Sequence, residues 1–202
     1  MYKDLAFNDD DELIDELRDL DYNSDDYSLF DPDCRGLNFS DDFNDEADII
    51  LDVPYVPTDE KIVQAMLDLA QVTSQDILYD LGCGDGRIVV AAALERNTHG
   101  VGIDMDPMRI TEAIEYASHT GVEYLVNFFE GDLLEADFSD ATVVTLYLLD
   151  LVNVQLRPRL LDELRPGTRI VSHAFDMGDW KPDREIKVDG KTIYLWIIPE
   201  KK

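Results

Sequence analysis

Three glycines at alternate positions, preceded by an acidic residue, form the part of this chain best suited to binding a ligand. The segment reads Asp80-Leu81-Gly82-Cys83-Gly84-Asp85-Gly86-Arg87. An apolar run from Ile77 leads into it and an apolar run from Ile88 follows, so the sequence predicts a strand, a tight turn and a helix. Glycine lets the backbone bend sharply and approach a ligand closely. Dinucleotide-binding turns place their third glycine one residue later, where this chain has Arg87, so a nicotinamide cofactor fits less well.

The spacing Asp80-x-Gly82-x-Gly84-x-Gly86 resembles the first motif of class I methyltransferases that use S-adenosylmethionine (SAM). The resemblance implies SAM as the cofactor and a Rossmann-like class I methyltransferase fold. It also implies that Asp80 interacts with the amino group of the cofactor, directly or through water. The cofactor-binding residues that we predict are Asp80, Gly82, Cys83, Gly84, Gly86, Asp104, Met105, Asp132 and Leu133.

A second acidic residue, Asp104, ends the short apolar run Val101-Gly102-Ile103. In a nucleoside-binding α/β fold the second strand ends beside the first, and an acid at its tip accepts both ribose hydroxyls. We therefore expect Asp104 to bind the ribose and Met105 to lie against the adenine. The alternative is that Asp104 caps the helix expected over 107–119, although Asp106 fits that cap better because it directly precedes a proline.

A third acidic residue, Asp132, follows the strand expected over 126–130. In the methyltransferases that the chain resembles, a carboxylate here receives the adenine amino group, and a neighbouring backbone N–H, which we assign to Leu133, meets a ring nitrogen. A buried base needs such partners because unpaired polar groups are costly to desolvate. The alternative is that Gly131-Asp132 is ordinary turn chemistry.

Aromatic side chains near the expected strand ends are candidates for the methyl-acceptor site, namely Tyr55, Tyr147 and Trp180. An apolar aromatic wall lowers the pKa of an acceptor lysine from about 10.4 and can hold a cationic group. Phe175 is placed similarly, but core packing is the better interpretation of it. His173 follows the fifth expected strand, and we interpret it as structural. The sequence identifies no catalytic base.

The charge of the 202-residue chain is −28 and is unevenly distributed. Residues 1–52 hold 19 Asp and Glu against 3 Lys and Arg, which predicts a largely disordered acidic extension before a SAM-binding domain over 53–202. Nucleic acids and anionic membranes are recognised through Lys and Arg, so neither is an expected partner. The 2 cysteines form no disulfide framework or metal-ligand cluster, and we expect no bound metal. Without an apolar span or targeting signal, a cytoplasmic location is expected, and the oligomeric state is left open.

Strands and helices are expected to alternate along the domain. Thr58 is the expected cap of a first helix, strands are expected over 77–81, 101–104, 126–130, 141–146 and 168–172, and a helix with Pro158 in its first turn is expected to end near Leu164. Asp189-Gly190 predicts a closing hairpin. This order predicts an α/β fold with a mostly parallel sheet and an antiparallel carboxyl-terminal hairpin.

Three segments narrow the resemblance: Pro54-Tyr55-Val56-Pro57-Thr58, the glycine turn, and Trp180-Lys181-Pro182. Over roughly 53–198 the chain resembles the mitochondrial protein-lysine methyltransferases that act on the ATP synthase c-subunit and the adenine nucleotide translocase, and their bacterial relatives. The resemblance implies a protein lysine as the methyl acceptor. The chain departs from those enzymes by its acidic extension and by lacking a membrane segment, which puts membrane-embedded targets in doubt. A small-molecule acceptor and a non-catalytic SAM-binding regulatory module are the alternatives.

Overall fold

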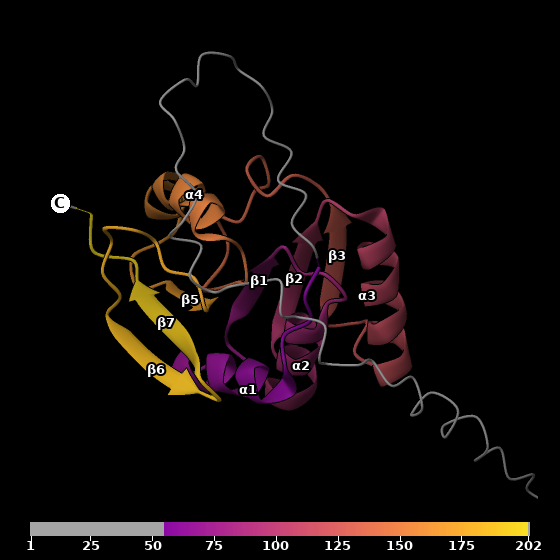
Figure 1. Ribbon diagram of the computed structural model, residues 1–202. Coiled ribbons are helices and arrows are strands. Elements are labelled where there is room, and N and C mark those ends of the chain that lie inside the picture. Colours follow the sequence, from indigo (N-terminus) through magenta and orange to yellow (C-terminus); the bar gives the residue numbers. More distant parts are fainter. Residues whose placement is uncertain (1–54, 202) are drawn as a thin grey trace, which may run out of the picture. The chain divides into compact units, whose positions relative to one another are not determined.

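The computed structural model describes residues 55–201, which contain a seven-stranded sheet in the order β3-β2-β1-β4-β5-β7-β6 (Figure 1). The first five strands pair in parallel, and β7 pairs antiparallel with both β5 and β6. The strands are β1 Ile77–Leu81, β2 His99–Asp104, β3 Val126–Glu130, β4 Val143–Leu146, β5 Arg169–His173, β6 Arg184–Val188 and β7 Lys191–Ile197. The helices are α1 Glu60–Leu69, α2 Arg87–Arg96, α3 Pro107–Thr120 and α4 Asp150–Glu163. The predicted α/β class and the antiparallel closing hairpin are confirmed.

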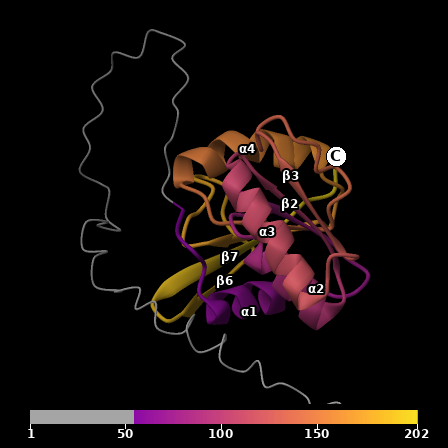
Figure 2. The ribbon, with the colours of Figure 1, turned by 90° about the vertical axis from the view of Figure 1, so that its right-hand side faces the viewer.

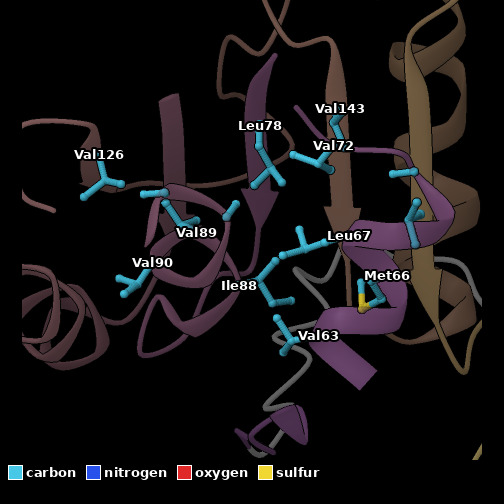
Figure 3. Packing of buried hydrophobic residues seen from close by; sticks show 14 of the residues in the cluster. Val63, Met66, Leu67, Val72, Leu78, Ile88, Val89, Val90, Val126 and Val143 are labelled. Atoms are coloured by element: carbon cyan, nitrogen blue, oxygen red, sulfur yellow. The ribbon is translucent and has the colours of Figure 1, made fainter. Parts of the chain in front are cut away.

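Helices cover the two faces of the sheet unequally. Residues of α1, α2 and α3 form one buried cluster with Leu78, Val143 and Val171 of the sheet (Figure 3). On the other face, Leu156 and Leu160 of α4 pack into a second buried cluster. In Figure 2, α4 lies on the opposite side of the sheet from α1 and α2. The central parallel strands β4 and β5 therefore lie between two apolar layers, which explains their apolar runs.

The closing hairpin turns through two residues in the left-handed region. Asp189 has φ 48° and Gly190 has φ 79°, and they join the paired residues Val188 and Lys191. Such a two-residue turn matches the right-handed twist of the strands that it connects. The Asp-Gly signal therefore correctly predicted the position of the hairpin turn.

Two predicted helix starts are wrong. Asp59, and not Thr58, caps α1, because its carboxylate accepts from the Lys61 N–H at 2.9 Å. Helix α4 begins at Asp150, so Pro158 lies inside the helix and not in its first turn. Burial of Leu156 and Leu160 against the second cluster holds α4 together across the proline, since tertiary packing outweighs local propensity. The predicted extension over 1–52 and its boundary lie outside the described residues and stay predictions.

Candidate cofactor and acceptor site

The glycine turn joins β1 to α2 with a backbone that other residues adopt only under strain. Gly82, Gly84 and Gly86 have φ values of 81°, 52° and 76°. A Cβ on Gly84 would lie 2.3 Å from a ring carbon of Tyr55, so the bare backbone lets this aromatic ring pack directly on the turn. Glycine is thus required here both for the left-handed backbone and for the close approach.

Asp104 joins the turn to the end of β2. Its Oδ2 accepts from the Gly84 N–H at 2.8 Å, and its Oδ1 accepts from the Asp106 N–H at 3.0 Å. The cap of α3 is Asp106, whose Oδ1 accepts from the Met108 N–H at 2.8 Å. The cap interpretation of Asp104 is therefore wrong. Its partly exposed carboxylate lies at the tip of β2, beside Met105, whose side chain is 65% exposed.

Asp80 lies beneath the turn and is 2% exposed. Burial raises the pKa of its carboxyl to about 7, the hydrogen bond from the Thr145 hydroxyl at 2.7 Å lowers it, and the carboxylates of Asp104 and Asp85 raise it. A cation placed near this carboxyl would favour its ionised form and lower its pKa. The ammonium group of a bound amino acid is such a cation, so the environment of Asp80 suits the predicted contact.

A cluster around Arg87 joins the Tyr55 segment to the turn. The Arg87 guanidinium donates to Asp85 from Nε at 2.9 Å and from Nη2 at 2.6 Å, and its Nη1 donates to the Thr58 carbonyl at 2.8 Å. The Arg109 guanidinium lies over the Tyr55 ring, 4.4 Å from its centre. Burial, with a smaller contribution from Asp85, raises the pKa of Tyr55 to about 12, so its phenol stays neutral. Sequence reasoning missed this role of Arg87.

Cys83 contributes backbone and packing to the turn. Its side chain is buried, and burial, reinforced by Asp80 and Asp104, raises the pKa of the thiol. A Cβ on Gly102 would lie 2.8 Å from its sulfur, so the thiol packs against β2. Because the thiolate is the nucleophilic form, this environment disfavours a nucleophilic role for Cys83. Its predicted contact with the cofactor would run through the backbone.

Two further predicted residues, Asp132 and Leu133, follow β3. The Asp132 carboxylate accepts from the Leu134 N–H at 2.8 Å, as in an ordinary turn, and it is partly exposed. Leu133 is 8% exposed and belongs to the second buried cluster. The hydrogen bond that Asp132 makes is therefore that of an ordinary turn. Adenine binding by Asp132 and Leu133 stays a prediction.

An aromatic group stands where β4 and β5 end. The rings of Tyr147 and His173 stack with their centres 4.0 Å apart, and the Phe175 ring lies 6.1 Å from Tyr147. His173 is 4% exposed, and neither of its ring nitrogens has a hydrogen-bond partner within the described residues. Burial, reinforced by the charge of Lys191, lowers the pKa of His173 to about 4, so the ring is neutral at neutral pH.

Trp180 has a different set of neighbours from Tyr147. Its ring centre lies 5.9 Å from that of Trp196, whose indole N–H donates to the Trp180 carbonyl at 2.8 Å. Both belong to the packing of the second cluster, on the α4 face. Tyr55 lies on the glycine turn, so the three acceptor-site candidates have different ring neighbours, and their role in the acceptor site stays a prediction.

Comparison with known proteins identifies the family. Residues 80–184 match the family model of the ANTKMT methyltransferase domain. A protein-lysine N-methyltransferase of Saccharolobus islandicus is 48% identical over 155 residues, which span 74% of this chain and 96% of that protein. The chain belongs to the ANTKMT methyltransferase family.

Other relatives of this methyltransferase act on different substrates. The human lysine N-methyltransferase of the ATP synthase c-subunit is 30% identical over 71% of this chain and 61% of its own length. A crystal structure of an RNA methyltransferase from Salinibacter ruber, in complex with S-adenosylhomocysteine, has a TM-score of 0.72 and 54% identity, and the match covers 73% of this chain and 96% of that one.

The family, fold, enzyme class and cofactor that the sequence predicted are confirmed by these comparisons.

The residues present fit SAM. When bound, SAM supplies a methyl group made electrophilic by a sulfonium. The glycine turn offers a backbone that a ligand can approach, and Asp104 offers a partly exposed carboxylate beside it. The amino end of α2 follows the turn and favours a negative group, such as a carboxylate, there. Within residues 55–201, no group of three or more His, Cys, Asp and Glu is arranged to hold a metal ion.

Proposed function

We propose that this methyltransferase transfers a methyl group from SAM to the side-chain amine of a protein lysine. The observation that carries the proposal is the 48% identity to an archaeal protein-lysine N-methyltransferase over 96% of that protein. Because the match extends over nearly the whole relative, it is not confined to the cofactor motif that many methyltransferases share.

The charge of the chain supports a basic protein as the substrate. At a formal charge of −28 the enzyme attracts lysine-rich segments and repels phosphate backbones. Electrostatic attraction of this kind raises association rates and decreases as salt increases. A protein lysine is therefore favoured over a nucleic acid.

The aromatic group at the ends of β4 and β5 suits a lysine acceptor. The amine must lose its proton before it can attack a methyl group, and transfer from water into an apolar site lowers its pKa by disfavouring the charged form. An acceptor placed beside Tyr147 would meet an apolar aromatic wall, because the Tyr147 ring stacks on the neutral His173 ring. Holding donor and acceptor in line supplies much of the acceleration of such a displacement.

RNA methylation is the second candidate, because the RNA methyltransferase from Salinibacter ruber is 54% identical over 96% of its length. The two candidates share a cofactor and a reaction type, and differ only in the acceptor. A small-molecule acceptor is a third candidate with no structural observation behind it.

Transfer of tritiated methyl from SAM into cell-free extract separates these candidates. Extract would be incubated with full-length enzyme, with the Asp104→Ala variant as the control, and then divided into protein, RNA and small-molecule fractions. We expect label in protein that protease releases and ribonuclease does not. Label that only ribonuclease releases, or that stays with metabolites, would replace the lysine proposal by one of the alternatives.

The location of the enzyme in the cell is also part of the proposal. We propose a cytoplasmic location, which can be checked by fractionation with an antibody against the chain. Among the described helices, none has the length and apolar character needed to span a membrane.

A further inference from the structure

One part of the sheet is less covered than the rest. In Figure 1, α4 lies above β5 and β7, on the opposite side of the picture from β3. Residues 131–142, which connect β3 to β4, contain turns but no helix. Phe129 of β3 is consequently 55% exposed and Ile77 of β1 is 36% exposed. Apolar side chains on this face of the sheet thus reach solvent beside the connection.

A groove of about 380 Å³ lies between this face and the connection. Its floor is apolar and consists of Tyr79, Val101, Ile103 and Phe129, from the three strands β1, β2 and β3. A volume of this size is at the lower end of the range that binds small ligands, and it accommodates a few apolar side chains of a peptide. The lining contains none of the three glycines of the turn, and neither Asp104 nor Met105, but it includes Asp132, which is predicted to bind the adenine, so the groove borders the predicted cofactor site.

The rim of the groove is acidic. Glu130, Asp132, Glu135 and Asp137 line it, whereas no Lys or Arg does. Within residues 55–201, none of these four carboxylates forms an ion pair. One of them acts on the floor: burial raises the pKa of Tyr79, and so do the carboxylates of Asp140, outside the lining, and of Asp137, on the rim. An apolar floor with an unpaired negative rim is complementary to a segment that carries both apolar and basic side chains.

We propose that this groove, defined by Tyr79, Val101, Ile103 and Phe129 and its acidic rim, binds a basic amphipathic segment of the protein substrate at a distance from the acceptor lysine. This inference rests on the proposed function. The charge of the rim selects the occupant: residues 1–52 of the chain are themselves strongly acidic, a second copy carries −28, and a phosphate backbone is negative, so all three are repelled.

The groove adjoins the cofactor site. The Gly131 N–H donates to the Asp104 carbonyl at 2.9 Å, and Asp104 pairs with Glu130 in the β2–β3 register. A segment in the groove would therefore lie next to the end of β2 where the ribose is predicted to bind. Such a contact adds affinity and places the rest of the substrate near the site without touching the reacting atoms.

A synthetic peptide tests the groove separately from methyl transfer. The probe is a fluorescein-labelled amphipathic peptide of Arg and Leu, which has no lysine and cannot be a lysine substrate. Full-length enzyme should bind it, and the same peptide with Glu in place of Arg should not bind. Reversing two exposed rim charges, in Glu135→Lys with Asp137→Lys, should weaken binding roughly tenfold or more in fluorescence anisotropy. Phe129→Ser, checked for an unchanged melting temperature, should also weaken it.

The matched control reverses two exposed charges away from the groove, Glu115→Lys on α3 with Glu123→Lys after it. This control variant has the same net charge as the rim variant. It should bind the Arg and Leu peptide several-fold more tightly than the rim variant does. Equal weakening in both variants would assign binding to overall charge and overturn the groove. Absence of peptide binding to the wild-type enzyme would also overturn the groove, even if lysine methylation is confirmed. SAM binding should be equal in all variants.

Discussion

At the scale of single residues, Asp104 links the end of β2 to the turn after β1. Its carboxylate accepts hydrogen bonds from the Gly84 and Asp106 N–H groups, which positions this edge of the sheet for a nucleoside. The sequence predicted the position of Asp104 because its spacing from the glycine turn follows from one strand–helix–strand unit. The Arg87 cluster could not be predicted, because its contact with Thr58 joins segments 29 residues apart and depends on how α1 packs.

Asp104→Ala should weaken SAM binding by about 1.5–3 kcal/mol, because a charged hydrogen-bond acceptor is lost from the predicted ribose site. Calorimetric titration with SAM and S-adenosylhomocysteine measures the effect. Asp106→Ala is the matched control: it removes the cap of α3 and should cost about 1 kcal/mol of stability while SAM affinity stays close to that of the wild type. Equal losses of affinity in the two variants would contradict ribose binding by Asp104.

His173 should make the stability of the enzyme depend on pH. Its pKa is about 4 in the folded chain and about 6.5 in the unfolded chain, so between these values only the unfolded chain binds the proton. The contribution of His173 to the free energy of unfolding is therefore fully present above pH 6.5. It is lost as the pH falls toward 4, by about 2–3 kcal/mol in all. His173→Phe should lack this loss.

Urea unfolding of wild-type enzyme and His173→Phe at pH 7 and pH 4.5 measures the difference directly. The comparison is made between the two proteins because Asp80 acts in the opposite direction: its raised pKa makes the folded chain bind the extra proton below pH 7. That contribution is common to both proteins and cancels. A free-energy difference between them that is the same at both pH values would refute a buried, neutral His173.

At the scale of elements, helix α4 shows what local signals miss. Pro158 predicted a helix start because proline favours the first turn, but packing of Leu156 and Leu160 extends the helix eight residues before it. The strands were easier to predict, because those that lie between two helix layers are continuously apolar, and the Asp189-Gly190 turn is locally encoded.

Pro158→Ala should stabilise the enzyme. Pro158 lies in the interior of α4 with its ring exposed, so its replacement restores a backbone N–H to the helix without removing buried surface. We expect the free energy of unfolding to increase by about 1–2 kcal/mol, less than the full helix propensity difference because alanine also makes the unfolded chain more flexible. Chemical denaturation gives the value, and a decrease in stability would show that the proline ring makes contacts that α4 needs.

At the scale of the whole molecule, the two buried clusters found within residues 55–201 extend from Ile62 to Ile198. Because the acidic composition of residues 1–52 predicts disorder, removal of residues 1–46 should leave SAM affinity and the melting temperature of the enzyme nearly unchanged. Calorimetry and thermal unfolding of the shortened chain test the predicted boundary near residue 53. Aggregation of the shortened chain, or loss of SAM binding, would show that the acidic extension belongs to the folded domain.

The identity of the methylated residue tests the central claim most directly. Protein labelled by the enzyme with tritiated methyl from SAM would be hydrolysed to amino acids and separated by chromatography. The structure and the family predict label in methylated lysine, and a large loss of that label when Asp104→Ala replaces the wild-type enzyme at limiting SAM. Label in a different amino acid or in nucleosides, or no label with enzyme that binds SAM, would contradict a SAM-dependent protein-lysine methyltransferase.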